Sequence, residues 1–276
     1  MKYYAFADEA SAMIDGQIAA MLRNGLQGLE IRNVDGVNVS SISLEKAAEV
    51  RRKLDDAGLI CWSIGSPIGK IDIVKDDFDA HMQTYLHTIE VAHALGAENI
   101  RMFSFYIPKG DDPAIYRNQV IDRLSLMAEK ARGTGVTLCH ENEKGIYGDL
   151  APRCLEIHQA IPEIAAIFDP ANYIQSGQET LSAWEMLKDK VKYLHIKDAL
   201  SDGSVVPAGH GLGHVPEIVR DFASRGGEAL TLEPHLTVFA GLSGLEREGE
   251  KSQVGKYVYR SSDEAFDAAA AAMKAL

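Results

Sequence analysis

The amino-acid sequence predicts an α/β fold, a single (β/α)8 TIM barrel that spans residues 1–276. Three observations lead to this prediction. Short strand-like runs alternate with longer helical patterns about eight times, the length of 276 residues is typical of one such barrel, and polar residues end the last four strands. A doubly wound open sheet is the alternative, but it would normally carry a glycine-rich phosphate loop after the first strand. The corresponding turn, residues 8–11, has no glycine.

The individual elements follow from apolar periodicity and from helix end signals. Strands are predicted at residues 3–7, 29–32, 59–64, 99–103, 136–141, 164–169, 191–196 and 229–233. The first helix is indicated by Ile14, Ile18, Met21 and Leu22 at helical spacing, and further helices are predicted over residues 43–57, 77–95, 113–132, 151–161, 180–188, 215–223 and 262–276. Ser43 is the expected N-cap of its helix, and glycines 58, 96 and 133 are expected stops.

Each of the last four predicted strands ends in a residue type that binds metals. Apolar or β-branched residues lead up to Glu141, Asp169, His195 and Glu233. The carboxyl ends of all strands meet at one face of a parallel barrel, so these side chains are expected to converge. Taken singly, each is as well explained as a helix cap or a salt-bridge partner. Burying three carboxylates together is costly through like-charge repulsion, so the set predicts one divalent ion: Mn²⁺ first, with Mg²⁺, Co²⁺ or Zn²⁺ as alternatives.

Composition and charge narrow the class of protein. The chain has 28 basic and 40 acidic residues, a net charge of −12, which disfavours a nucleic-acid partner because phosphate backbones need a basic surface. Three cysteines make no paired framework and indicate a reducing compartment. The N-terminus is too short and acidic for a signal peptide, and no apolar run approaches the roughly 20 residues of a membrane span. We therefore expect a soluble cytoplasmic protein without a membrane partner.

Three predicted connections are longer than usual and follow the second, fourth and eighth strands, at residues 33–42, 104–112 and 234–261. Long loops on the catalytic face of a barrel are commonly lids or substrate walls. The third loop carries aromatic and charged side chains, namely Phe239, Glu246, Arg247, Lys251, Lys256, Tyr257 and Arg260. It is expected to be a functional wall, or else a surface excursion or a subunit contact.

The strand-end segments are similar to the signatures of a known family. They read His140-Glu141-Asn142-Glu143, Phe168-Asp169-Pro170-Ala171-Asn172, Leu194-His195-Ile196-Lys197-Asp198 and Leu232-Glu233-Pro234-His235. These segments, with residues 7–11 and 207–213, resemble the sugar phosphate isomerase/epimerase family, the xylose isomerase-like TIM barrels. The resemblance covers essentially the whole chain. It implies that Glu141, Asp169, His195 and Glu233 bind one divalent metal, and that Glu141 and Glu233 also form an acid/base pair. Dimers and tetramers are common in the family, so a homo-oligomer is one expectation.

We therefore expect a metal-dependent isomerase or epimerase that acts on a sugar, a sugar phosphate or a polyol-derived ketone. A ketose bound through its carbonyl and neighbouring hydroxyl has an acidified C–H, and the metal stabilises the resulting enediolate. One carboxylate removes the proton and the other returns it. The alternative is a dehydratase of an inosose or a dehydroshikimate-like acid, since the family includes such enzymes. A dehydratase needs an acid for the leaving hydroxyl, and His140, Lys197 or His210 could serve.

Two further classes fit the sequence less well. A phosphodiesterase of the endonuclease IV type would need a three-metal cluster with additional histidines on early strands, where this chain has Arg32 and residues 63–66. A non-catalytic carbohydrate-binding protein would keep a pocket but would not need two opposed carboxylates. The presence of both Glu141 and Glu233 disfavours this second class.

Five residues near the strand ends are predicted to contact substrate: Arg101, Glu143, Asn172, Lys197 and His210. Asn172 stands where many relatives carry histidine, so it is interpreted as a contact to substrate or to a metal ligand. Lys197 lies two residues past His195 and should point to the same side, to hold a substrate oxygen or to pair with a strand-end acid. His210 lies in a glycine-rich loop whose backbone N–H groups could approach a hydroxyl or a phosphate. Aromatic side chains expected as sugar walls or as core are Trp62, Phe103 and Tyr147.

Overall fold

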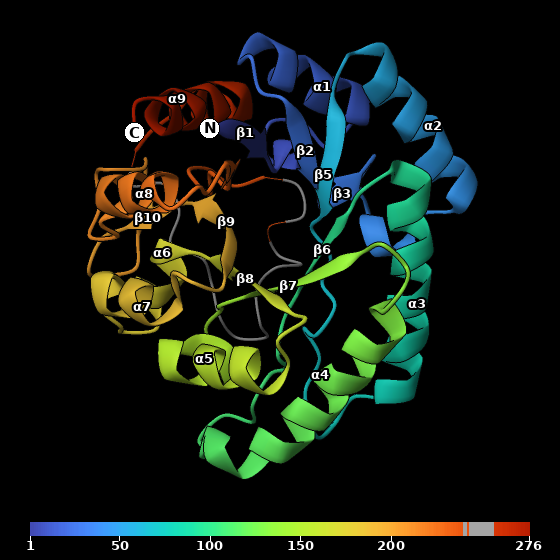
Figure 1. The fold of residues 1–276 in the computed structure, drawn as a ribbon. Helices are drawn as coiled ribbons and strands as arrows, with labels where there is room; N and C mark the ends of the chain where they lie inside the picture. Colours follow the sequence, from blue (N-terminus) through green and yellow to red (C-terminus); the bar gives the residue numbers. More distant parts are fainter. Residues whose placement is uncertain (240–241, 243–256) are drawn as a thin grey trace.

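The computed structural model describes residues 1–239, 242 and 257–276. Within these residues, eight parallel strands close into one barrel, and their order around it follows the chain (Figure 1). The strands are β1 (Lys2–Ala5), β2 (Gly28–Ile31), β5 (Ile60–Ile64), β6 (Asn99–Met102), β7 (Thr137–Glu141), β8 (Ala165–Phe168), β9 (Val191–Ile196) and β12 (Ala229–Leu232). The predicted barrel is therefore confirmed.

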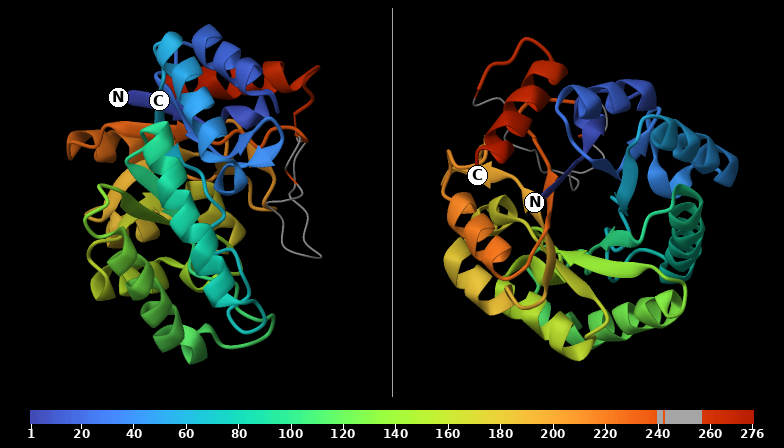
Figure 2. Two further views of the ribbon diagram at one scale, coloured as in Figure 1. Left: turned by 90° about the vertical axis from the view of Figure 1, so that its right-hand side faces the viewer. Right: turned by 45° about the horizontal axis from the view of Figure 1, so that its top comes forward.

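Helices form a ring outside the strands, and the two chain termini lie near one another (Figure 2). The helices are α1 (Ile14–Arg23), α2 (Leu44–Asp56), α3 (Phe78–Leu95), α4 (Arg117–Ala131), α5 (Ala151–Ala160), α6 (Pro170–Gln175), α7 (Thr180–Leu187), α8 (Val215–Ser224) and α9 (Ser262–Lys274). Two of the predicted end signals act as expected. The Ser43 hydroxyl accepts a hydrogen bond from the Lys46 N–H at 3.1 Å and caps α2. Gly96 ends α3 with a φ of 71°.

The structure differs from the sequence prediction in short elements. The predicted first strand ends at Ala5, and a 3₁₀ turn (Ala7–Glu9) follows. The predicted helix over residues 113–132 begins with a 3₁₀ turn (Pro113–Tyr116) before α4. Two small hairpins lie in predicted loops: β3 (Asn33–Val34) with β4 (Val37–Asn38), and β10 (Asp198–Ala199) with β11 (Val205–Val206). The six-residue helix α6 was not predicted, and it directly follows a predicted metal ligand.

Aromatic side chains fill the barrel interior below the strand ends. The Tyr4 ring stacks on Trp62 with 4.6 Å between centroids, and Trp62 meets Tyr193 edge-on at 5.7 Å. Trp62 also lines a surface hollow beside the first residues of β9 and β12. Of the two alternatives predicted for Trp62, the core position is therefore the one observed, because the side chain packs against the buried Tyr4 and Tyr193 at the end of the barrel opposite the strand-end carboxylates.

The apolar core lies between the strands and the surrounding helices. Phe266, Ala270 and Met273 of α9 are fully buried in it, and Leu276 packs against it, as the helical spacing predicts. No helix within the described residues is long and apolar enough to cross a membrane. Of the residues highlighted in the third long loop, Glu246, Arg247, Lys251 and Lys256 lie outside the described residues.

Candidate metal centre

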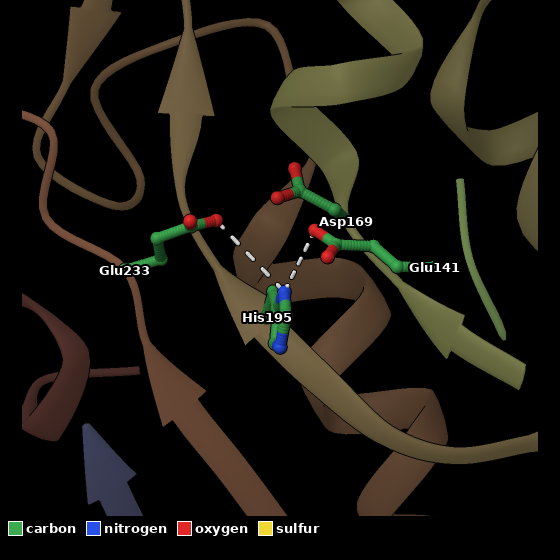
Figure 3. A group of neighbouring side chains, drawn as sticks. All are labelled: Glu141, Asp169, His195 and Glu233. Carbon is green, nitrogen blue, oxygen red and sulfur yellow. Dashed lines mark hydrogen bonds and ion pairs between the residues drawn. The ribbon is translucent and has the colours of Figure 1, made fainter. Parts of the chain in front are cut away.

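Four side chains from the carboxyl ends of four neighbouring strands converge at the barrel mouth. Glu141 is the last residue of β7, Asp169 follows β8, His195 lies on β9 and Glu233 follows β12. One ligand atom from each residue lies within 4.8 Å of the other three, and none of the residues is more than 3% exposed. Figure 3 shows Glu141 and Glu233 approaching His195 from opposite sides. The structure thus brings together the four residues that the strand-end pattern singled out.

The electrostatics of the cluster show a shortage of positive charge. Burial is the main cause that raises the pKa of Asp169 to about 7, and the negative charges of Glu233 and Glu141 add to it against the attraction of Lys197. Burial also opposes the charge on His195, yet the carboxylates of Glu141 and Glu30 raise the pKa of His195 to about 10. In the absence of a metal, the imidazole therefore carries a proton and acts as a counter-ion.

His195 is held in one orientation by Glu30, a buried glutamate on β2. The His195 Nε2 lies 3.2 Å from Glu30 Oε2, while Nδ1 lies 2.9 Å from Glu141 Oε1 and 3.9 Å from Glu233 Oε2. The other Glu30 oxygen accepts hydrogen bonds from the Tyr193 hydroxyl at 3.0 Å and from Ser63 at 3.3 Å. A carboxylate that accepts the outer N–H of a histidine fixes which nitrogen can bind a metal. Nδ1 is therefore the nitrogen directed at the other three residues.

Asp169 is fixed by the start of α6, so that one of its oxygens remains for a ligand. Its Oδ1 accepts a hydrogen bond from the Asn172 N–H at 2.9 Å and caps the helix. The Asn142 side chain bonds both the N–H and the C=O of Asp169, at 2.9 and 3.0 Å. Asp169 Oδ2 is buried without an aligned donor, although Lys197 Nζ lies 2.9 Å away.

These residues fit a divalent metal ion. Three carboxylates and one imidazole nitrogen are a donor set that suits Mn²⁺, Co²⁺, Mg²⁺ or Zn²⁺. Lys197 lies between Asp169 Oδ2 and Glu233 Oε2, at 2.9 and 2.7 Å, and compensates only part of their charge. The convergence of one ligand atom from each of the four buried residues within 4.8 Å is the observation that fits a cation most directly.

Four of the five predicted substrate contacts lie beside this cluster. Lys197 is described above, and the Asn172 amide donates to Glu141 Oε1 at 3.3 Å. Arg101 Nη1 donates to Glu141 Oε2 at 3.2 Å. Glu143 pairs with Lys70 at 3.0 Å and adds negative charge near Lys197. Whether these side chains also contact a substrate stays a prediction.

The fifth predicted contact, His210, is not brought to the cluster by the described residues. It is exposed, its N–H donates to Pro207 O at 3.0 Å, and its ring lies 6.5 Å from Tyr257. The glycine N–H groups of the same loop also have an internal partner. Gly209, Gly211 and Gly213 donate to the carboxylate of Asp198, at 3.0, 2.9 and 2.8 Å. These N–H groups hold the loop on β10 rather than pointing at a ligand.

Sequence reasoning left several residues of the mouth without a role. Arg32 makes a two-point contact with Asp8, with Nε and Nη2 each 2.9 Å from a carboxylate oxygen, and it reaches Glu9 at 3.1 Å and Glu233 at 3.2 Å. Asp8 and Glu9 belong to the segment 7–11 of the family resemblance, and Arg32 is the last residue of the second predicted strand. Lys70 lies after β5, and its Nζ lies 4.4 Å from the centre of the Phe103 ring. No sequence pattern marks Lys70 as a residue of the site.

Comparisons with known proteins agree with the fold and the family resemblance. The chain belongs to the xylose isomerase-like TIM barrel family, whose model matches residues 18–251. A similar solved structure is the probable 3-DHS dehydratase AsbF from Bacillus anthracis, with a TM-score of 0.76 at 15% identity over 99% of both chains. Another is the 3-keto-D-glucoside 4-epimerase YcjR from E. coli, with a TM-score of 0.73 at 13% identity over 100% of both chains.

A third similar structure contains a metal. It is the IOLI protein with a bound zinc atom, which has a TM-score of 0.73 at 14% identity over 99% of this chain and 96% of that one. None of the curated proteins compared with this chain matches it. At these identities the structural likeness establishes the fold alone, so the activity has to be argued from the site.

Proposed function

We propose that this protein is a divalent-metal-dependent isomerase or epimerase of a sugar or a related polyhydroxy ketone. The observation that carries the proposal is the convergence of Glu141, Asp169, His195 and Glu233 within 4.8 Å at the barrel mouth. Two of the four, Glu141 and Glu233, flank the others from β7 and the end of β12 (Figure 3). Similar structures include an epimerase and a dehydratase, which is consistent with proton transfer beside a carbonyl.

The four residues would hold the ion, which supplies a Lewis acid for a carbonyl and its neighbouring hydroxyl when it is bound. Neighbouring charges keep both glutamates ionised: burial opposes the charge on Glu141, but His195 and Arg101 lower the pKa of Glu141 to about 2. Burial also opposes the ionisation of Glu233, but Lys197, His235, His195 and Arg32 together keep the pKa of Glu233 well below its ordinary value. In the proposed reaction Glu233 removes the C–H proton from one side, and Glu141, after it has taken up a proton from solvent, returns one from the opposite side and inverts the centre. Return of the proton by Glu233 to the adjacent carbon gives the isomerase outcome.

A dehydratase is the second candidate, since it shares the first proton abstraction. It would need an acid beside the leaving hydroxyl, and the sequence offers His140, Lys197 and His210 for this role. His140 Nε2 pairs with Ser104 Oγ at 3.0 Å, and its ring lies 5.8 Å from His158, so its partners lie away from the cluster. His210 is exposed. Lys197, at 2.7 Å from Glu233, is the acid that this alternative would use.

Deuterium incorporation tests the proposal and separates it from the alternative. The metal-loaded protein is incubated in D₂O with free and phosphorylated ketoses and with inososes, and the products are analysed by mass spectrometry. We expect at least one ketose to gain a deuteron beside its carbonyl without losing water, and the exchange to stop after chelation. Loss of water instead would indicate the dehydratase. Exchange that continues unchanged in the metal-free protein would overturn the proposal.

Substitution of the two glutamates tests their roles in proton transfer directly. Glu141→Gln and Glu233→Gln should each lower the exchange rate about 10²- to 10⁴-fold, because a general acid or base typically contributes that much. Glu163→Gln is a matched control, since Glu163 is on the surface and pairs with Arg132. Full exchange activity in Glu233→Gln, even with its metal lost, would contradict the assignment.

A further inference from the structure

We propose that Glu9, Glu233 and His235 form a second divalent-cation site, which shares Glu233 with the first centre. One ligand atom from each of the three residues lies within 4.8 Å of the other two. The residues come from the turn after β1 and from the chain just after β12, two strands that are neighbours in the barrel. The inference goes beyond the single ion of the proposed function and depends on it only through Glu233.

The imidazole of His235 is the observation that points to a ligand. His235 is 7% exposed, and its Nδ1 is buried without a hydrogen-bond partner. The same Nδ1 lies 3.6 Å from Glu9 Oε1 and 3.6 Å from Glu233 Oε1. Ligand bonds of 2.0–2.2 Å in a tetrahedral arrangement separate two ligand atoms by about 3.4 Å. His235 Nδ1 therefore lies at nearly the ligand spacing from each carboxylate oxygen, and it is too far from both for a direct hydrogen bond.

Two contacts and a left-handed backbone conformation hold His235 in this position. Its backbone N–H donates to Glu9 Oε2 at 2.6 Å. Its ring packs against Phe239 with 5.5 Å between centroids. Its φ of 44° lies in the left-handed region, which non-glycine residues adopt rarely and at a cost. The same carboxylate thus positions the backbone through Oε2 and offers Oε1 beside the unpaired nitrogen.

The three residues lie in a network of buried charges. Four buried carboxylates, those of Asp8, Glu9, Asp169 and Glu233, face Arg32 and Lys197, and Glu233 is also reached by Arg101 Nη1 at 4.0 Å and by His195 Nδ1 at 3.9 Å. Arg32 is committed first to Asp8, with two contacts of 2.9 Å, and its contacts to Glu9 and Glu233 are longer, at 3.1 and 3.2 Å. A divalent ion held by Glu9, Glu233 and His235 would replace these longer contacts of Arg32, whose two-point contact with Asp8 would remain.

The ligand chemistry indicates the class of ion. One imidazole nitrogen and two carboxylates suit Mn²⁺, Co²⁺ or Zn²⁺ better than Ca²⁺, which prefers six to eight oxygen ligands. A carboxylate that bridges two ions is a common feature of two-metal sites, in which the ions lie about 3.5–4 Å apart. Such a pair would present two adjacent positions for neighbouring oxygens of a polyhydroxy substrate.

The test counts ions and asks whether they interact. The chelated full-length protein is reloaded with Mn²⁺, passed through gel filtration and measured for metal content, while electron paramagnetic resonance detects coupling between two Mn²⁺ ions. We expect the wild type to hold two ions per chain with a coupled signal. His235→Asn, which tolerates the left-handed backbone, and Glu9→Gln should each retain one ion and lose the coupled signal. His93→Asn, on the exposed face of α3, is the matched control and should keep both ions.

Each outcome decides between this site and the first centre. One ion in the wild type, with metal-dependent deuterium exchange and no change in His235→Asn, would overturn the second site and leave the proposed function standing. Two ions in the wild type and two in both variants would also overturn it, because the second ion would then lie elsewhere. A wild type that binds no divalent ion would overturn both proposals.

Discussion

The side chain of Glu30 shows how one residue outside the candidate ligand set can decide what the set does. Glu30 lies 3.2 Å from His195 Nε2 and leaves Nδ1 directed at Glu141 and Glu233. Its own position is fixed by Tyr193 and Ser63. Glu30, Tyr193 and Ser63 are all buried strand residues. The barrel itself therefore sets the orientation of the His195 imidazole, independently of a bound ion.

The substitution Glu30→Gln tests this orientation. An amide is a weaker acceptor than a carboxylate for the His195 N–H, so the affinity for Mn²⁺ should fall about 10- to 100-fold. Isothermal titration calorimetry of the chelated protein measures the change. Glu98→Gln on the surface should leave the affinity as it is. An unchanged dissociation constant in Glu30→Gln would mean that the glutamate does not position the ligand.

The protonation of His195 predicts how metal binding depends on pH. Because the pKa of His195 is raised to about 10 in the metal-free protein, the imidazole carries a proton that must leave before the nitrogen can bind an ion. Near pH 8 we expect release of about one proton per ion, and a dissociation constant that falls about tenfold per pH unit as pH rises. Below pH 7, Asp169 adds a second proton, because burial raises its pKa to about 7.

Calorimetry in two buffers with different ionisation enthalpies measures the released protons. A dissociation constant that is the same at pH 7.5 and 8.5, with no proton release, would show that His195 is not a ligand. Sodium chloride at equal ionic strength without added Mn²⁺ gives the baseline for heats of dilution and non-specific effects.

Some residues at the mouth of the barrel can be predicted from the sequence, and others cannot. Glu141, Asp169, His195 and Glu233 could be found because each ends an apolar strand, and parallel strands end at one face. His235 and Lys70 could not be found in this way, because they lie in loops whose path depends on tertiary contacts. His235 is placed by its hydrogen bond to Glu9, 226 positions earlier in the chain. No local pattern contains that contact.

At the scale of elements, Asp198 on β10 organises the glycine-rich loop before α8. Its two carboxylate oxygens accept hydrogen bonds from Ala199, Gly209, Gly211 and Gly213. A Cβ at Gly213 would lie 2.7 Å from Asp198 Oδ1, so the close approach of the loop requires a glycine there. The glycines that suggested a ligand-binding loop in the sequence serve the packing of this loop on its own strand.

Replacement of Asp198 by alanine should destabilise the protein by about 3 kcal/mol, because several N–H groups lose their acceptor at once. Urea unfolding of the chelated protein, followed by circular dichroism, measures the loss. Glu217→Ala on the exposed side of α8 is the control and should change the stability by less than about 0.5 kcal/mol. A similar small change in Asp198→Ala would contradict this role.

Long elements of the fold could be predicted, and short ones could not. The strong periodicity of α2 and α3, together with Ser43 and Gly96 at their ends, predicts both helices to within one residue. The helix α6 has six residues, too few to show a periodic apolar face. Its start is signalled only by Asp169 as a cap and by the following proline. The hairpins β3–β4 and β10–β11 have two residues per strand, which is too short to show an alternating apolar pattern.

At the scale of the whole molecule, the barrel places three carboxylates and one histidine close together at one end. The free energy of unfolding should therefore depend on a bound metal ion. Mn²⁺ at 100 times its dissociation constant should add about 2.7 kcal/mol to the free energy of unfolding by mass action. In a protein of this size that corresponds to a rise in Tm of about 5 °C. Differential scanning calorimetry with Mn²⁺ and with a chelator measures the shift. The shift should become smaller in Asp169→Ala; an equal shift in that variant would place the stabilising ion elsewhere.

The central claim is that Glu141, Asp169, His195 and Glu233 hold a divalent ion at the mouth of the barrel. Anomalous X-ray scattering from crystals of the protein loaded with Mn²⁺ tests it most directly, because the peak locates the ion. The account predicts a peak within about 2.0–2.3 Å of His195 Nδ1 and of one oxygen from each carboxylate. Well-ordered crystals of the loaded protein with no anomalous peak among these four side chains would contradict it.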